Sequence, residues 1–261
     1  MNNLELSYFD IQAYMGTTKH MGGLEATKDL IELCRIHADQ FVLEVGCGVG
    51  ATAVYLAKKH NCRVVGVDIS EQMIARAEER SKGEGVQNQV EFRVASAIAL
   101  PFQDGHFDAV ICQSVTTFIE EKAKAICEYD RVTKPGGYVG LNEETWIKTP
   151  PPPELIEFTR RTWEIESEIP TAEVWIGWME DCGLEHIRAK PYRFSAARES
   201  SQVRRYRVRD FVRMAYRTLY LYVTRPDFRE YMQDRRSLPQ NLFDYLGHGV
   251  YVGKKKQEMQ T

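Results

Sequence analysis

The glycine-rich segment Glu44-Val45-Gly46-Cys47-Gly48-Val49-Gly50 has the residue types of a ligand-binding turn. Its glycines let the backbone turn tightly, and they let a ligand approach where a Cβ atom would clash. An apolar run precedes the segment and a helical pattern follows it. The free N–H groups at the start of that helix carry positive partial charge and suit an anionic group. The spacing therefore predicts a ligand-binding loop between a strand and a helix.

Two cofactor classes fit this loop. Gly46, Gly48 and Ala51 satisfy the G-x-G-x-x-G/A spacing of dinucleotide-binding turns. Asp68, 22 residues after Gly46, could hold a ribose diol in either class. Glu44 separates them, because a carboxylate only accepts hydrogen bonds. A nicotinamide dinucleotide offers it no ammonium group, whereas the methionine half of S-adenosylmethionine does.

Strand and helix patterns alternate along the first half of the chain. Short apolar runs predict strands at 41–45, 64–69, 90–94, 107–112 and 138–141. Amphipathic segments predict helices at 24–36, 51–60, 71–82 and 120–132. This alternation is typical of a doubly wound, mainly parallel α/β sheet. Ligands of such sheets bind beyond the carboxyl ends of the strands, so the residues that follow each strand are the candidates for a site.

The composition indicates a globular protein, with 43% hydrophobic and 27% charged residues and a net charge of −3. This charge gives no general attraction to nucleic acid or to an anionic membrane. No run approaches the roughly 20 apolar residues of a membrane helix. Six cysteines are scattered without a C-x-x-C pair or a Cys/His cluster. We therefore expect reduced thiols, no metal site, no membrane span and a cytoplasmic protein.

After Lys148 the sequence changes in character. Four consecutive prolines at 150–153 form a stiff connector. We expect helices at 155–168, 172–182, 208–223 and 226–236, and strands at 186–189 and 249–253. Residues 198–236 carry eleven arginines against five acids, interleaved with tyrosines. Three interpretations stay open: solvated helix faces, a cover over an acidic or aromatic acceptor, or an RNA-binding patch, which the slightly acidic chain disfavours.

Five segments resemble the motifs of class I S-adenosylmethionine-dependent methyltransferases, in the style of the ubiquinone/menaquinone methyltransferase branch and many small-molecule enzymes. They are 42–50, 64–70, 90–102, 107–110 and 131–137, in the family's order and spacing. The terminal segment 247–254 resembles the family's last, antiparallel strand. The resemblance implies a seven-stranded sheet with a cofactor-binding core at 40–148. An N-terminal arm and first helix would occupy 1–39, and 149–261 would complete the sheet with a helical substrate cover at about 198–236.

The resemblance also implies which residues bind the cofactor: Tyr14, Glu44, Gly46, Cys47, Gly48, Gly50, Asp68, Ile69, Met73, Ser96, Ala97 and Gln113. Glu44, the loop and Gln113 would line the methionine end, and Asp68 would accept from both ribose hydroxyls. Adenine would lie between Ile69 and Met73. Many relatives have Asp where Ser96 stands, so the contact of this uncharged side chain with the adenine amino group should be weaker.

Methyl transfer is an in-line displacement, in which orientation of the reactants contributes on the order of 7–11 kcal/mol. A general base is needed only when the acceptor must lose a proton. His20 and Glu143 are the candidates in the N-terminal arm and after the fifth strand, with Glu144 and His248 as further ones. We expect a small-molecule acceptor, aromatic or anionic. The alternatives are a nicotinamide-dependent oxidoreductase and a non-catalytic protein that keeps the cofactor-binding fold.

Overall fold

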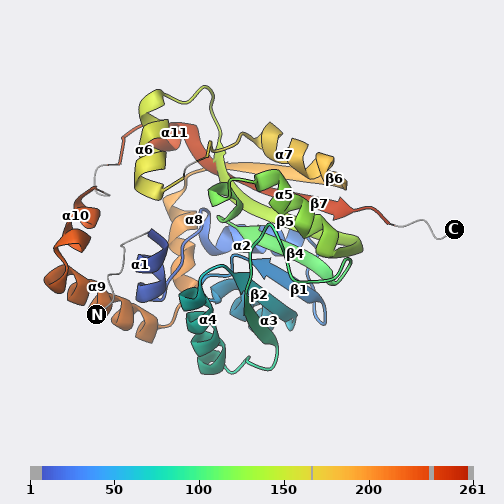
Figure 1. Cartoon of the computed structure of the whole chain (residues 1–261), viewed down its shortest axis with the longest axis horizontal. Helices are drawn as coiled ribbons and strands as arrows, with labels where there is room; N and C mark the ends of the chain where they lie inside the picture. The colour runs from blue at the N-terminus through green and yellow to red at the C-terminus, as the bar shows by residue number, and fades with distance from the viewer. Residues whose placement is uncertain (1–7, 166, 235–237, 258–261) are drawn as a thin grey trace.

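The computed structural model describes residues 8–165, 167–234 and 238–257. Its strands form one sheet with helices on both faces (Figure 1). The strands are β1 (Phe41–Val45), β2 (Arg63–Asp68), β3 (Val90–Val94), β4 (Phe107–Gln113), β5 (Thr133–Trp146), β6 (Leu184–Arg193) and β7 (Leu246–Lys255). The helices are α1 (Tyr8–Met15), α2 (Gly23–Leu33), α3 (Ala51–His60), α4 (Glu71–Glu84), α5 (Lys122–Val132), α6 (Pro153–Trp163), α7 (Ala172–Asp181), α8 (Ala196–Ser200), α9 (Val208–Thr224), α10 (Pro226–Asp234) and α11 (Leu242–Tyr245). Two 3₁₀ turns, η1 (Thr116–Phe118) and η2 (Ser201–Arg205), complete the set.

The sheet has seven strands in the order β3-β2-β1-β4-β5-β7-β6. Strands β1 to β5 pair in parallel, and β7 runs antiparallel between β5 and β6. The order reverses between β1 and β4, which places their carboxyl ends at the switch point of the sheet. This topology confirms the predicted doubly wound, mainly parallel sheet of seven strands.

Each face of the sheet has its own apolar core, because alternate side chains of a strand point to opposite faces. On one face, Leu30 of α2 and Leu56 of α3 pack with Val42 and Ile111 of the sheet. On the other face, α5 and α7 pack against the remaining apolar side chains of β1, β2 and β4. The strands are therefore buried on both sides, as their continuous apolar runs predict.

Strand β5 is longer than the sequence pattern predicts. We expected residues 138–141, but the strand runs from Thr133 to Trp146 because β7 pairs with it from Tyr138 to Trp146. Glu143 and Glu144 therefore lie within the strand, opposite Gly249 and His248. The helix expected at 155–168 ends at Trp163. The last two residues of the helix expected at 226–236 lie outside the described residues.

The segment between β6 and β7 contains α8 to α11 (Figure 1). Helix α9 lies beside α1, and Ile11 of α1 packs with Leu221 of α9 and Phe228 of α10. The 3₁₀ turn η2 contacts α2 and α3 near the sheet. The insertion therefore returns to the core at η2, while α9 and α10 extend away from the sheet. None of the helices within the described ranges is long and apolar enough to cross a membrane.

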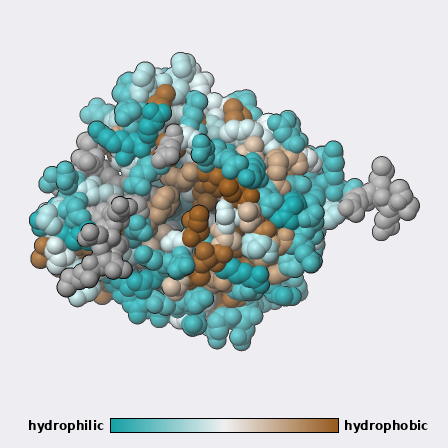
Figure 2. Space-filling view, viewed as in Figure 1, coloured by the Kyte–Doolittle hydropathy of each residue, from teal (hydrophilic) through white to brown (hydrophobic). Residues whose placement is uncertain are grey.

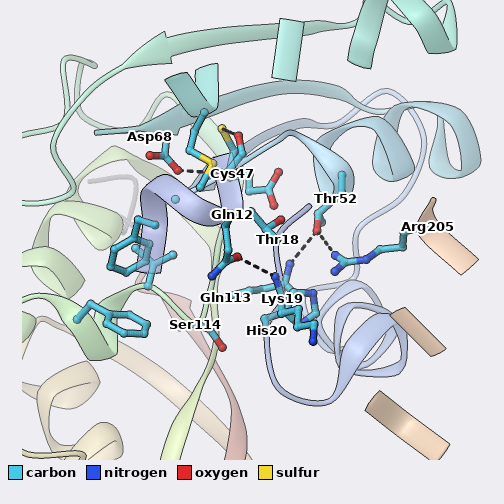
Figure 3. A pocket seen from close by; sticks show the side chains of 18 of the residues that line it. Gln12, Thr18, Lys19, His20, Cys47, Thr52, Asp68, Gln113, Ser114 and Arg205 are labelled. Atoms are coloured by element: carbon cyan, nitrogen blue, oxygen red, sulfur yellow. Dashed lines mark hydrogen bonds between the residues drawn. The ribbon is translucent and has the colours of Figure 1, made fainter. Parts of the chain in front are cut away.

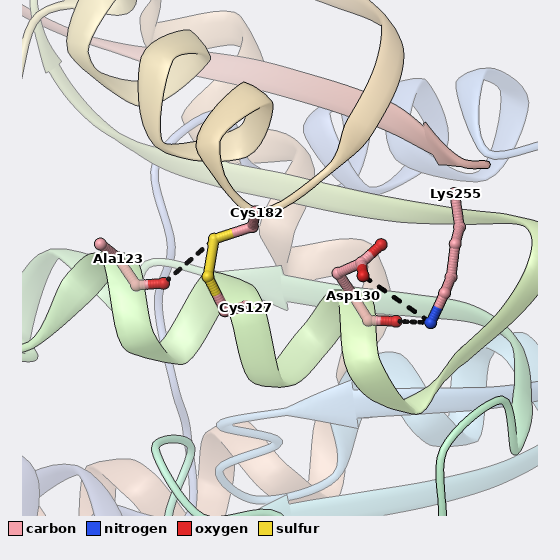
Figure 4. Close-up of a disulfide and its surroundings, with 5 residues drawn as sticks. All are labelled: Ala123, Cys127, Asp130, Cys182 and Lys255. Carbon is pink, nitrogen blue, oxygen red and sulfur yellow. Dashed lines mark hydrogen bonds and ion pairs between the residues drawn. A yellow bond between two sulfur atoms is a disulfide. The ribbon is translucent and has the colours of Figure 1, made fainter.

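The expectation that every cysteine is a free thiol is wrong. A disulfide joins Cys127 of α5 to Cys182, which directly follows α7 (Figure 4). The other four cysteines are free and buried. Sequence spacing did not reveal the pair because the two residues are 55 positions apart and meet only when α5 and α7 pack on the same face of the sheet.

Replacing Cys127 with serine should lower the free energy of unfolding by up to about 4 kcal/mol, because a crosslink that closes a loop of this length restricts the unfolded chain. Urea denaturation measures this change, with Cys62→Ser in reducing buffer as a reference for loss of a buried thiol. The denatured protein should also take up four alkyl groups before reduction and six after it. Six alkyl groups without reductant would contradict the disulfide.

Candidate active site

A pocket opens at the carboxyl ends of the strands, where apolar residues surround a hollow on the face shown in Figure 2. It has two adjoining chambers. The first is polar and contains Glu44 and Arg205, and the second is apolar and contains Ile69 and Ala97. Both chambers share the lining residues Phe9, Gly46, Asp68, Met73, Val115 and Phe118. An elongated ligand with one charged end and one apolar end would fit this arrangement.

The glycine loop forms the floor between the chambers. Gly46 and Gly48 have φ of 68° and 50°, in the left-handed region that favours glycine. A Cβ atom at Gly48 would lie 2.6 Å from Cγ2 of Thr18, and one at Gly46 would collide with Val115. Both glycines line the polar chamber, as does the buried Cys47, whose thiol has its pKa raised by burial. Gly50 lies behind the loop, and a Cβ atom at this position would lie 2.8 Å from Cζ of Phe92.

Asp68 joins the loop to the end of β2. Its Oδ2 accepts a hydrogen bond from the backbone N–H of Gly48 at 2.9 Å, and its Oδ1 accepts one from the N–H of Ser70 at 3.0 Å. Each carboxylate oxygen has further lone pairs, so both can accept from a ligand as well. Asp68 lines both chambers and so lies where they meet; Figure 3 shows its carboxylate near the Cys47 segment of the loop.

Glu44 is a buried carboxyl group in the wall of the polar chamber. Burial raises its pKa to about 8, although nearby Arg205 and a hydrogen bond with Thr52 act in the opposite direction. Its Oε2 has no hydrogen-bond partner among the residues that the structure describes. A buried polar atom without a partner costs about 1–3 kcal/mol, and a ligand that donates to it would recover this free energy.

Thr52 links three polar groups of this chamber. Its Oγ1 accepts from Nε2 of Gln113 at 3.2 Å and from a terminal nitrogen of Arg205 at 3.0 Å. Oε1 of Gln113 in turn accepts from the hydroxyl of Thr27 at 2.9 Å. Figure 3 shows the Gln113 and Arg205 side chains converging on Thr52. The network fixes Gln113 and brings a guanidinium group from η2 to the wall that holds Glu44.

The second chamber has the predicted apolar residues. Ile69 is 76% exposed although it is a large apolar residue, and Met73 on the first turn of α4 is buried. Ser96 and Ala97 line the same chamber after β3, as does Phe118 of η1. An exposed isoleucine beside a cavity suits a flat, apolar ligand group that would cover it.

His20 is buried in the wall of the polar chamber. Its Nε2 lies 3.4 Å from Oγ1 of Thr27, and its Nδ1 lies 3.4 Å from Nδ2 of Asn142. Burial, and secondarily the charge of Arg205, hold the pKa of His20 well below its ordinary value. The imidazole is therefore neutral at physiological pH, and the role of His20 as a base stays a prediction.

The two neighbouring glutamates of β5 have different surroundings. The Glu143 carboxylate accepts from three backbone N–H groups, of Val115, Thr116 and Thr117, and from the Thr117 hydroxyl at 2.8 Å. It is fully buried and does not appear in the lining of either chamber. This arrangement favours a role in positioning the segment after β4 over the catalytic role that we expected from the sequence.

Glu144 faces the polar chamber instead. Its Oε1 accepts from the Ser114 hydroxyl at 2.8 Å, while its buried Oε2 has no partner within the described part of the chain. Burial, followed by the charge of Glu143, raises the pKa of Glu144 to about 7. Ser114 has a φ of 52°, an uncommon backbone conformation for a residue other than glycine. Glu144 is thus the carboxylate of this pair that a ligand can reach.

Tyr14 lies away from the chambers. Its ring lies 5.6 Å from the Arg217 guanidinium group, and it packs in the cluster that joins α1 to α9. Phe9 and Gln12, from other faces of α1, line the polar chamber in its place. The N-terminal segment contributes to the pocket through these other residues, because a helical repeat of 3.6 residues turns Tyr14 toward the insertion.

Sequence reasoning missed several residues that line the pocket. Arg205 is one of eleven arginines in its segment, and nothing in its spacing distinguishes it from the others. Thr52 lies on the first turn of α3, directly behind the glycine loop, where a polar side chain at a helix start was a usable signal. Phe118 of η1 follows β4, at the edge of the sheet where ligands bind.

Comparison with known proteins agrees with the fold and the loop. The family described as "Methyltransferase domain" matches residues 43–141. An uncharacterized protein from Haemophilus influenzae is 34% identical over 178 residues, which are 67% of this chain and 70% of that protein. Phosphoethanolamine N-methyltransferase 1 from Arabidopsis thaliana is 34% identical over 140 residues. That match covers 54% of this chain but only 28% of the plant protein.

Solved structures show the same fold. Phosphoethanolamine N-methyltransferase 2 from Haemonchus contortus, in complex with phosphomonomethylethanolamine and S-adenosylhomocysteine, has a TM-score of 0.74 at 18% identity. The match covers 95% of this chain and 57% of that one. A structure described as the [4+2]-cyclase SpnF has a TM-score of 0.69 at 22% identity and covers 88% and 80% of the two chains. From its motifs, sheet topology and relatives, the chain belongs to the class I S-adenosylmethionine-dependent methyltransferases.

Proposed function

We propose that this protein transfers a methyl group from S-adenosylmethionine to a small-molecule acceptor. The observation that carries the proposal is the unpartnered Oε2 of Glu44, buried beside the glycine loop. The ammonium group of the methionine end is a donor that this oxygen lacks. Asp68 at the junction and the apolar chamber beyond it match a ribose and an adenine in the order in which the cofactor connects them.

The residues of the site would hold the cofactor by complementary charge. Glu44 would bind the ammonium group, and Arg205 the carboxylate of the same amino acid. Asp68 would accept from the ribose hydroxyls, while Ile69 and Met73 would cover adenine. When bound, S-adenosylmethionine supplies an electrophilic methyl group on a sulfonium. The protein then needs to orient the acceptor and exclude water.

The lining of the pocket and the relatives of the chain support a small acceptor, and Glu144 supports one with a protic nucleophile. Glu144 lines the polar chamber, and its carboxylate could accept the proton of an acceptor N–H or O–H group that binds there. The rings of Phe9 and Phe118 form an edge-to-face pair in the wall, with their centroids 5.1 Å apart. Such a wall suits an aromatic or apolar group. Lys19 adds a positive charge to the same wall, which suits an anionic one. Plant relatives named phosphoethanolamine N-methyltransferases also support a small acceptor.

Replacing Asp68 with asparagine should weaken S-adenosylhomocysteine binding by about a hundredfold, because hydrogen bonds to a charged acceptor contribute roughly 1.5–3 kcal/mol each. Isothermal titration calorimetry measures this change. Asp104→Asn is the matched control, since the Asp104 side chain is 80% exposed and lies before β4 at the other end of the strands. Unchanged affinity in a folded Asp68→Asn protein would remove this residue from the site.

Binding of S-adenosylhomocysteine at pH 7 should release about one proton, because Glu44 is protonated in the free protein at a pKa of about 8 and an ammonium partner favours its ionised form. Calorimetry in buffers of different ionisation enthalpy counts this proton. Glu44→Gln should release none, and neither should 5′-methylthioadenosine, which lacks the amino acid. Equal proton release from both ligands would contradict the assignment of Glu44.

Glu144 acts as a base only when it is ionised, so methyl transfer should fall as the pH decreases through about 7. The assay is tritiated-methyl transfer to metabolites extracted from the native host. Glu144→Gln should lower the rate by about 10²–10⁴-fold and remove this pH dependence, while S-adenosylhomocysteine affinity stays within severalfold. A Glu144→Gln protein with the wild-type rate and pH profile would show that Glu144 is not the base.

A further inference from the structure

Helix α9 exposes an apolar stripe on its outer side. Val208, Val212, Tyr216, Leu219 and Val223 are each between 62% and 79% exposed. At 100° per residue these positions fall within an arc of about 80°. The inward side of the same helix is already packed against α1 and α10. The outer stripe is thus a second apolar face that nothing in the described part of the chain covers.

A row of arginines runs beside the outer stripe and borders a separate cavity between α4 and α9. Arg209, Arg213 and Arg217 recur every four residues, next to the stripe on the helix surface. Arg76 and Arg80 of α4 face them across the cavity. We call this five-arginine site the arginine cleft. It shares no lining residue with the two chambers of the cofactor pocket.

Only part of the positive charge in the arginine cleft is neutralised. Glu79 pairs with Arg76 at 3.0 Å, and Asp210 lies 3.6 Å from Arg80. These two carboxylates are the acids of the lining, against five guanidinium groups. A third acid, Glu84, lies outside the lining and pairs with Arg209 at 3.6 Å.

The remaining two arginines have no carboxylate partner in the described ranges. Arg217 donates to the backbone oxygen of Tyr14 at 2.7 Å, and no hydrogen bond or ion pair of Arg213 is present there. Burial, followed by the like charges of Arg76 and Arg213, lowers the pKa of Arg217. The cleft therefore keeps an excess of positive charge that an anion would relieve.

The outer stripe and the arginine cleft together indicate which kind of partner binds this surface. A second copy of the chain could cover the outer stripe, but two antiparallel α9 helices would bring their arginine rows together. Helix α9 has one acid, Asp210, which already accepts from the backbone N–H of Arg207 at 2.9 Å. The partner must instead offer apolar groups and anions side by side. An amphipathic helix with a basic flank is typical of binding at an anionic bilayer surface.

We propose that α9 docks this protein on a membrane that contains acidic phospholipids. The outer stripe enters the boundary between headgroups and acyl chains, and the arginine cleft binds a lipid phosphate. The near-neutral net charge of the chain did not predict this, because the positive charge is local. The inference is independent of the proposed methyl transfer, and its test uses no activity assay.

Co-sedimentation with phosphatidylcholine vesicles, with and without phosphatidylglycerol, tests the proposal on the full chain. The protein should bind only the vesicles that contain phosphatidylglycerol, and salt should weaken binding. Arg213→Glu and the double variant Val212→Ser/Leu219→Ser should each weaken it roughly tenfold or more. The controls are Arg160→Glu on α6 and Val174→Ser on α7, both exposed and far from α9 in sequence, and these should bind as the wild type does.

Three outcomes would overturn the proposal. The first is no preference for phosphatidylglycerol vesicles. The second is calorimetric binding of inorganic phosphate or glycerol phosphate that requires Arg213 while vesicles are not bound, which would indicate a site for a free phosphate. The third is a concentration-dependent dimer that Leu219→Ser abolishes, in protein that does not bind vesicles. An unchanged thermal shift with S-adenosylhomocysteine would verify that each variant is folded.

Discussion

The site depends on a carboxyl group that the fold buries without satisfying. Strand β1 carries Glu44 into the interior, where no donor of the described residues reaches its Oε2. Burial of such a group costs free energy, and the neutral form that its raised pKa favours reduces the cost. An ammonium group that donates to Oε2 would offset this cost. Thr52 and Arg205 line the same wall as Glu44.

The sheet supplies the remaining constraints. Parallel strands bring Asp68, Gln113 and Glu144 to one edge, although Gln113 follows Asp68 by 45 residues and Glu144 follows Gln113 by 31. The neighbouring carboxylates of Glu143 and Glu144 differ in their hydrogen bonds. Glu143 accepts from four donors and holds the segment after β4, whereas its neighbour Glu144 lines the polar chamber and has one buried oxygen without a partner among the described residues. Adjacent residues of a strand point to opposite faces, which explains this division.

Much of this arrangement was predictable from the sequence. The glycine loop, Asp68 and the alternation of strands and helices in the first half of the chain follow from local signals that tertiary contacts do not overrule. Other features depend on which elements meet in space, which no local pattern encodes. They are the length of β5, the direction of Tyr14 and the Cys127–Cys182 pair. Arg205 is the clearest case, because its selection from many arginines depends on where η2 contacts α3. The insertion between β6 and β7 therefore required the structure.

In the proposed complex, the pocket binds S-adenosylmethionine through its amino acid and its nucleoside together. The most direct measurement is a calorimetric titration of the wild-type protein with S-adenosylhomocysteine and, separately, with NADH. We expect a one-to-one complex with S-adenosylhomocysteine and no heat of binding with NADH at the same concentrations. Binding of NADH without binding of S-adenosylhomocysteine would contradict it.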